Sequence, residues 1–161
     1  MQSLERRRNV ALFVALVATA LALGAALAHA LELSSKIRLS QGDYFIVQQI
    51  YAGWDRLAYL LLVEFAGMIA TVLLFRSEPR VFGAALAALA FLILAQAVFW
   101  MFTFPANVAT ENWTVQPQDW QAQRARWEYS HLAGAVLQML AMTAVATAAV
   151  LSRHRAAPPA A

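Results

Sequence analysis

The chain has 161 residues, of which 61% are hydrophobic and 13% are charged, and its formal net charge is +3. A typical soluble domain carries roughly 25% charged residues. The composition therefore excludes an ordinary soluble domain and favours a membrane protein. Cysteine is absent, which excludes disulfides, thiolate metal sites, iron–sulfur clusters and covalently attached c-type haem.

Four apolar runs divide the chain, and they contain one acidic residue, Glu64, and neither lysine nor arginine. Runs of about 19 to 24 residues cross a hydrocarbon core of roughly 30 Å. We therefore predict an all-α, multi-pass bundle of four transmembrane helices. The predicted spans are Asn9 to Leu31, Leu57 to Phe75, Val81 to Phe104 and Tyr129 to Ser152.

The first run has a second interpretation, because Arg6 to Arg8, an apolar stretch and Ala28-His29-Ala30 are also typical of a cleaved signal peptide. The apolar core of a signal peptide is usually about 7 to 15 residues long. A run of about 23 residues suits a complete span instead. We therefore expect the first run to be retained as a transmembrane helix.

Basic residues between the runs indicate the orientation. The side that holds both termini carries Arg6, Arg7, Arg8, Arg76, Arg80, Arg153 and Arg155, and the other side carries Lys36, Arg38, Arg56, Arg124 and Arg126. The positive-inside rule then places both termini in the cytoplasm, for a protein integral to the cytoplasmic (inner) membrane. Basic residues beside spans meet lipid headgroups, so we expect the lipid bilayer as a partner and no nucleic acid.

Residues 1–155 are predicted to form a single domain, followed by a disordered tail at 156–161 that contains Pro158-Pro159. Small residues on membrane helices mark faces that pack closely. On this basis we expect Gly67 with Thr71, and the ridge of Ala20, Gly24 and Ala28, to lie inside the bundle. The Ala-rich part of the third run could pack within one monomer or against a second copy, which leaves a homo-oligomer open.

The two outer segments are predicted to be partly helical. Ser40 followed by Asp43 has the pattern of a helix N-cap, and the helix that it starts either lies along the interface or runs into the second span. Pro117 suits the first turn of a helix that continues into the fourth span. Pro105 is expected to end the third span, because its ring interrupts the hydrogen-bond ladder.

The two histidines near the outer ends of the first and fourth spans are predicted to lie at one depth. His29 follows Arg8 by 21 residues and His131 precedes Arg153 by 22 residues. At 1.5 Å per residue both lie roughly 31 to 33 Å from the cytoplasmic end. Either histidine alone is more often structural than catalytic, but matching depth on two spans favours a shared site.

Each histidine has a carboxylate partner in the sequence. Glu32 and Glu128 stand three residues from His29 and His131, and residues three apart are neighbours on a helix face. Asp55 and Asn107 are expected at the same level. We therefore predict a polar layer at the outer mouth of the bundle, and its residues are His29, Glu32, Asp55, Asn107, Glu128 and His131.

Glu64 differs because it is the one acid well inside the hydrocarbon, roughly 18 Å from the level of Arg76. A carboxylate at that depth is expected to face the bundle interior. It could accept a proton or form the floor of a substrate pocket. Alternatively, it could hydrogen-bond between helices, near the level of Gln138, and fix their register.

A metal site is the less favoured alternative for the polar layer. Di-iron bundles use two Glu-x-x-His motifs and two further glutamates. Here Glu128-x-x-His131 matches once, His29-x-x-Glu32 has the reverse order, and the second motif is missing. We therefore expect no cofactor. The ligands of the alternative metal site would be His29, Glu32, Asp55, Glu128 and His131.

The aromatic residues gather at the same end. All five tryptophans and all four tyrosines fall on the outer side, whereas aromatic anchor belts are normally found at both membrane faces. Aromatic walls with a few polar groups are typical of a site for a flat, hydrophobic small molecule. We therefore expect a pocket at the outer end.

Two stretches resemble the anthrone oxygenase-like family of small four-span membrane proteins. They cover both outer segments and the adjoining span ends. The first comprises His29-Ala-Leu-Glu32, Lys36, Leu39-Ser40, Asp43-Tyr44, Val47-Gln-Gln-Ile-Tyr51 and Gly53-Trp54, and the second comprises Pro105-Ala-Asn107, Trp113, Trp120, Arg126-Trp-Glu128 and His131.

The resemblance implies a cofactor-independent oxidoreductase that converts an anthrone to an anthraquinone with O₂. In that role His131 or His29 would be the base, oriented by Glu128 or Glu32. The expected oxyanion donors are Arg126 and Asn107. The residues expected to bind the substrate are Tyr51, Trp54, Trp113, Trp127 and Glu64.

A non-enzymatic protein is the alternative to an enzyme. It would be a module that binds a small ligand or a lipid, or a subunit whose outer face docks a partner. The enzyme requires the histidine–glutamate pairs to converge on one site, whereas the alternative allows them to point apart.

Overall fold

The computed structural model describes residues 2–154, and every regular element in that range is a helix. Four helical stretches of the described chain are long and apolar enough to cross a membrane, which confirms the predicted number of spans and the all-α class. They are Gln2–Lys36, Trp54–Leu74, Pro79–Ala109 and Trp120–Arg153. The tail predicted at 156–161 lies outside the described residues.

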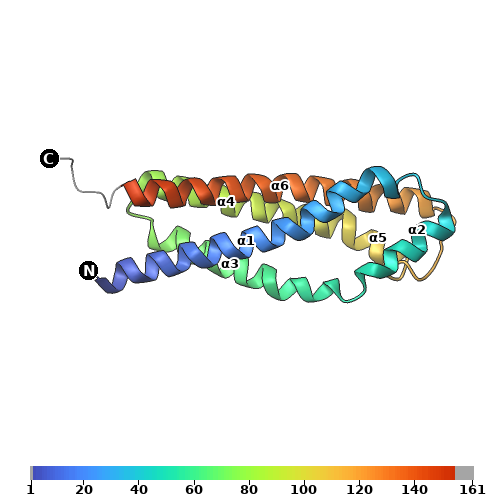
Figure 1. Cartoon of the computed structure of the whole chain (residues 1–161), viewed down its shortest axis with the longest axis horizontal. Coiled ribbons are helices and arrows are strands. Elements are labelled where there is room, and N and C mark those ends of the chain that lie inside the picture. Colours follow the sequence, from blue (N-terminus) through green and yellow to red (C-terminus); the bar gives the residue numbers. More distant parts are fainter. Residues whose placement is uncertain (1, 155–161) are drawn as a thin grey trace.

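The first and last helices, α1 (Gln2–Lys36) and α6 (Trp120–His154), have 35 residues each. At 1.5 Å per residue each is roughly 52 Å long, which exceeds the roughly 30 Å of a hydrocarbon core. Figure 1 shows that α1 begins and α6 ends at the same end of the bundle. Their far ends therefore extend together beyond the apolar spans, where the outer segments cover them.

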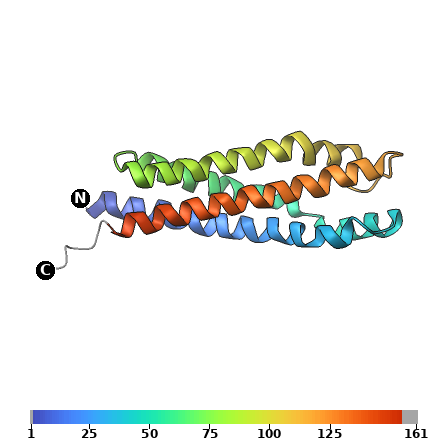
Figure 2. The same ribbon diagram turned by 90° about the horizontal axis from the view of Figure 1, so that it is seen from above.

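The second span contains α3 (Leu57–Leu74), and the third span begins with α4 (Pro79–Val98). The helix α1 packs against α3 and α6, and α4 packs against α6 and α3, which gives the elongated four-helix arrangement of Figures 1 and 2. The main apolar core fills the half of the bundle nearer the termini. It contains Leu12, Ala15, Met68, Val72, Phe75, Val81, Ala85, Ala88, Leu92, Ala141, Val145 and Ala148.

The second span approaches the first closely at Gly67 of α3. A Cβ atom at this position would lie 2.9 Å from the backbone nitrogen of Ala15 on α1. One turn away, the Thr71 hydroxyl is buried and donates a hydrogen bond to the Gly67 carbonyl at 2.8 Å. The prediction that these small residues of the second span lie inside the bundle is confirmed.

The corresponding prediction for α1 is wrong at Ala20 and Gly24, which are exposed. A Cβ at Gly24 would meet nothing within 4 Å. The buried face of α1 is instead the one that carries Ala15, Ala18 and Ala22. Small residues occur on both faces of this helix, so their spacing did not identify the buried face.

The close approach gives a stability prediction. Gly67→Ala is expected to lower the free energy of unfolding by about 1 to 3 kcal/mol, because the new methyl group overlaps helix backbone that cannot move aside cheaply. Gly24→Ala is the matched control, since it adds a methyl group in open space and should leave stability equal or slightly higher. Unfolding by SDS titration in detergent micelles, followed by circular dichroism, measures both. The opposite ranking of the two variants would contradict the α1–α3 packing.

The third span continues past Pro105, contrary to the prediction that it ends there. A π-helical turn, η3 (Phe99–Thr103), follows α4 and leads directly into α5 (Phe104–Ala109), with Pro105 in its first turn. The wider turn of a π-helix changes the hydrogen-bond register. The π-helical turn thereby accommodates Pro105, which lacks a backbone N–H and whose ring would clash in the interior of a regular helix.

The first outer segment forms a separate short helix, α2 (Gln41–Gln48). Its predicted N-cap is confirmed, because the Ser40 hydroxyl accepts the Asp43 N–H at 3.3 Å. Two 3₁₀ turns, η1 (Gln49–Tyr51) and η2 (Trp54–Arg56), connect α2 to α3. Gly53 between them has φ +87°, a conformation that favours glycine, and the break prevents α2 from running directly into the span.

The second outer segment is mostly turns before α6 begins at Trp120. Pro117 therefore precedes the helix, and its carbonyl accepts the Trp120 N–H at 3.1 Å. The prediction that this outer helix continues without interruption into the fourth span is confirmed. The continuous helix carries Trp127, Glu128 and His131 down from the outer end into the bundle.

Candidate functional site

The two histidines predicted to share one depth are in contact. The ring centroids of His29 on α1 and His131 on α6 are 4.3 Å apart. His29 is buried and His131 is half-buried. The α1–α6 contact thus brings together two residues that are 102 positions apart in the sequence.

Trp127 lies at the centre of the rings around this pair. Its ring centroid is 3.9 Å from that of His131, 5.1 Å from that of His29 and 5.5 Å from that of Tyr51. Trp54 completes the group, with its ring 5.0 Å from His29. These five side chains, His29, Tyr51, Trp54, Trp127 and His131, are called the histidine–aromatic cluster below.

Asn107 of α5 holds two of the tryptophans. Its side-chain oxygen accepts the indole N–H of Trp127 at 2.9 Å and that of Trp113 at 3.3 Å. Within residues 2–154 its amide nitrogen has no hydrogen-bond partner. Asn107 therefore fixes the position of the central indole and keeps two N–H donors free.

A strained loop places Trp113 against this group. Three consecutive residues, Glu111, Asn112 and Trp113, have positive φ angles of 46°, 55° and 66°, a conformation that costs about 1 to 3 kcal/mol per residue outside glycine. The buried Trp113 ring packs 5.1 Å from Tyr44 and 5.5 Å from Phe45 of α2. Burial of this large ring offsets the backbone strain.

The structure adds Lys36, whose role the sequence reasoning missed. This lysine is only 3% exposed. Its ammonium nitrogen lies 3.2 Å from Glu128 Oε1 and 3.5 Å from Glu32 Oε2, and it donates to the Tyr51 hydroxyl at 2.9 Å. A signal was present in the sequence, because Lys36 stands seven residues after His29 and therefore on the same face of α1.

The ammonium group of Lys36 also faces two aromatic rings. It lies 4.5 Å from the centroid of Trp127 and 4.7 Å from that of Tyr51. Such cation–π contacts are favourable, and more so when both groups are shielded from water. Lys36 therefore joins the two glutamates to the histidine–aromatic cluster.

Glu128 is buried, with 1% of its surface exposed. Its Oε1 accepts a hydrogen bond from the Tyr44 hydroxyl at 2.9 Å, and that hydroxyl accepts one from Gln48 at 2.6 Å. Burial, together with the neighbouring Glu128 carboxylate, raises the pKa of Tyr44 far above its usual value. Tyr44 therefore remains a neutral donor to Glu128.

Glu32 is bound in a similar way. It accepts a hydrogen bond from Tyr51, and burial with the adjacent Glu32 carboxylate raises the pKa of the Tyr51 hydroxyl. Both predicted glutamates thus converge on Lys36, each with a neutral tyrosine beside it. The carboxylates are held by an ammonium group and two phenols.

The histidines are oriented differently from the predicted scheme. Among the residues described, no hydrogen bond joins either histidine to Glu32 or Glu128. Instead, His131 Nδ1 lies 2.9 Å from the Trp127 carbonyl oxygen. A carbonyl can only accept, so Nδ1 carries the hydrogen and Nε2 keeps its lone pair. His29 Nδ1 is buried and has no hydrogen-bond partner among residues 2–154.

Two predicted residues lie outside this arrangement, Asp55 of the polar layer and Arg126, which was expected as an oxyanion donor. The side chains of Arg126 and Asp55 are exposed, and within the described chain neither forms an ion pair or hydrogen bond with the site. No group of three or more histidine, aspartate or glutamate side chains in residues 2–154 is arranged to hold a metal ion. Glu32, Glu128 and Lys36 instead form an ion-pair network.

Glu64 is buried separately from the outer cluster. Its Oε1 accepts a hydrogen bond from Gln138 of α6, and its Oε2 has no hydrogen-bond partner in the described part of the chain. The link between α3 and α6 favours a role in helix register over one in the outer site.

The rings of the histidine–aromatic cluster contact one another, so a ligand must enter between them or displace one. Trp54 is the exposed member of the cluster, with 36% of its surface accessible. It sits in a 3₁₀ turn directly after Gly53. Trp54 is therefore the ring of the cluster that is most accessible from outside the bundle.

No protein-family model matches this chain, and no curated protein or solved structure matches it significantly. The resemblance to anthrone oxygenase-like proteins therefore depends on the outer-end residues that carry it. The structure brings many of those residues together, including His29, Lys36, Tyr51, Trp127 and His131.

Proposed function

We propose that this chain is an oxygenase-like oxidoreductase of the cytoplasmic membrane, with both termini in the cytoplasm, that oxidises an anthrone-like aromatic substrate with O₂. The observation that carries the proposal is the contact between His29 and His131 within a shell of aromatic rings. His131 has the tautomer of a base, because its Nδ1 hydrogen is used by the Trp127 carbonyl.

The proposed reaction begins with proton transfer. Nε2 of His131 accepts a proton from the ring methylene of the anthrone, and the electron pair delocalises onto the carbonyl oxygen. The carbanion then transfers one electron to O₂, and the two radicals combine through a new carbon–oxygen bond. The His131 imidazolium protonates the resulting peroxide. Loss of the second methylene proton with cleavage of the O–O bond releases water and leaves the quinone.

Two groups of the chain are suited to stabilise the negative charge that forms on the carbonyl oxygen. The amide nitrogen of Asn107 has two free N–H donors beside Trp127. The Lys36 ammonium lies 4.5 Å from the Trp127 ring and places positive charge beside the cluster. Fixed donors of this kind act where charge develops. Arg126 is left out of the mechanism because its side chain is exposed.

Oxygen uptake with a model anthrone tests the proposal. His131→Ala is expected to lower the rate by a factor of roughly 10² to 10⁴, the usual contribution of a positioned base. Arg126→Gln is the matched control on the same helix and should retain the wild-type rate. Equal rates in the wild type and His131→Ala would contradict the proposed mechanism.

A non-enzymatic ligand-binding module is the second candidate, and it is favoured by the packing of the rings against one another. Such a module would bind an anthrone and quench the fluorescence of Trp127 and Trp54 without consuming O₂. Saturable quenching with no uptake above the protein-free rate would select this candidate over the enzyme.

A further inference from the structure

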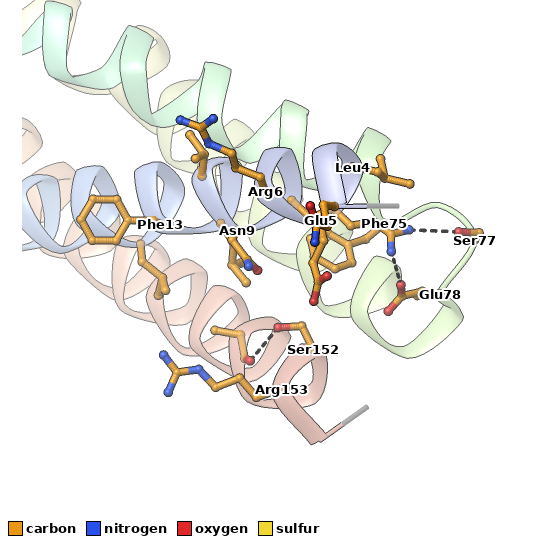
Figure 3. Close-up of a pocket in the computed structure, with 16 residues that line it drawn as sticks. Leu4, Glu5, Arg6, Asn9, Phe13, Phe75, Ser77, Glu78, Ser152 and Arg153 are labelled. Carbon is orange, nitrogen blue, oxygen red and sulfur yellow. Dashed lines mark hydrogen bonds and ion pairs between the residues drawn. The ribbon is translucent and has the colours of Figure 1, made fainter. Parts of the chain in front are cut away.

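A groove of about 1290 Å³ lies at the opposite end of the bundle, between the start of α1, the α3–α4 turn and the end of α6. It is larger than the roughly 300 to 1,000 Å³ of a pocket for a drug-sized ligand. Figure 3 shows Glu5 and Asn9 extending from α1 toward α6, which carries Ser152 and Arg153. The groove is separate from the histidine–aromatic cluster.

The groove changes from polar to apolar along α1. Glu5 and Asn9 lie at its polar end, and Leu12, Phe13 and Leu16 continue it toward the centre of the bundle. Leu16 follows Glu5 by 11 positions, a rise of roughly 16 Å along the helix. Phe13 has 66% of its surface exposed, so the apolar part opens toward the hydrocarbon of the membrane. This gradient fits an amphiphile that lies parallel to the helices.

The charges of the groove fall into a paired set and an unpaired set. Arg8 and Glu78 form an ion pair at 2.7 Å, and Arg8 also donates to Ser77. Within residues 2–154, Glu5 and Arg153 form no ion pair. A carboxylate from α1 and a guanidinium from α6, both without an ion-pair partner in the described residues, therefore border the same groove, and Arg6 of α1 is a second such guanidinium.

Arg6 is oriented away from this pair. In Figure 3 it lies on the side of α1 opposite Ser152 and Arg153. It also borders a second hollow on the face of α1 that meets α3, beside Val14 and Gly67. Arg6 therefore borders both hollows, whereas Glu5 and Arg153 are the unpaired acid and base on the side of the groove between α1 and α6.

We propose that the groove binds one membrane phospholipid whose headgroup carries both a phosphate and a primary ammonium, as phosphatidylethanolamine does. The phosphate lies at Arg153, whose fork of N–H donors matches phosphate oxygens. The ammonium group lies at Glu5 and Asn9. An acyl chain follows Leu12, Phe13 and Leu16 into the hydrocarbon.

The experiment is native mass spectrometry of the delipidated full-length protein, titrated separately with phosphatidylethanolamine, phosphatidylcholine and phosphatidylglycerol of identical acyl chains. The wild type is expected to retain phosphatidylethanolamine best. Glu5→Gln should remove the preference over phosphatidylcholine, because the carboxylate contacts the ammonium. Arg153→Gln should weaken all three lipids by roughly two- to fivefold, the range for one partly solvated charge contact. Arg56→Gln, at the other end of the bundle, is the control and should change nothing.

Equal affinity of the wild type for the three lipids would overturn the proposal. An unchanged headgroup preference in Glu5→Gln would overturn it too. Circular dichroism of each variant checks that the fold is retained. Lipid binding is measured without an activity assay. The result for the groove is therefore independent of the function proposed for the outer site.

Discussion

Replacing Lys36 by methionine is expected to lower the free energy of unfolding by about 3 to 5 kcal/mol, the usual effect of removing one partner from a buried ion pair. The ammonium group is 3.2 Å from Glu128, and both side chains are buried. Methionine retains most of the volume of the lysine stem but leaves Glu128 without its compensating charge. Thermal and SDS unfolding in detergent micelles measure the change.

The double variant Lys36→Met/Glu128→Gln separates charge from packing. Glutamine has nearly the shape of glutamate and carries no charge, and its amide oxygen can still accept the Tyr44 hydrogen bond. We therefore expect the second substitution to restore most of the stability lost in Lys36→Met. If Lys36→Met and Glu128→Gln each lower the free energy of unfolding and the two losses add in the double variant, the 3.2 Å contact is energetically unimportant.

Replacing Trp127 by alanine is expected to lower the free energy of unfolding by about 3 to 5 kcal/mol, as for other buried tryptophans. The side chain is buried, contacts both histidines and donates to Asn107. Loss of the ring leaves a cavity at the centre of the cluster. It also removes one of the two N–H groups that donate to the side-chain oxygen of Asn107. Near-UV circular dichroism should also lose intensity, since Trp113 and Tyr51 pack against this ring.

Two further variants calibrate that result. Trp100→Ala removes a tryptophan that is 58% exposed on η3, and a much smaller change is expected. Trp127→Phe keeps a ring but removes the N–H donor to Asn107, so its effect should lie between the two. Equal destabilisation by Trp100→Ala and Trp127→Ala would contradict the central position of Trp127.

The spans and the shared depth of the histidines were predictable because both follow from distance along a helix. Hydropathy locates a span from its length, and 1.5 Å per residue converts sequence position into height. Counting from the arginines thus placed His29 and His131 at one level, and they are in ring contact. The N-cap at Ser40 was also predictable, because it depends only on neighbouring residues.

Features that depend on which face of a helix meets which neighbour were not predictable in this way. Gly24 and Gly67 look alike in the sequence, yet only Gly67 meets another backbone. Pro105 was expected to end a helix, and the π-helical turn before it removes the clash. The burial of Lys36 depends on Glu128, which comes from the other end of the chain. Tertiary contacts decide each of these outcomes.

The most direct test of the central claim, that His29 and His131 act in one site, is a double-mutant cycle in anthrone-dependent oxygen uptake. The rates of the wild type, His29→Ala, His131→Ala and the double variant are compared at saturating substrate. Residues that act as a unit are strongly non-additive, so the double variant should be no slower than the slower single variant. If the two losses multiply, or if neither single variant loses activity, the shared site proposed for the 4.3 Å histidine pair is contradicted.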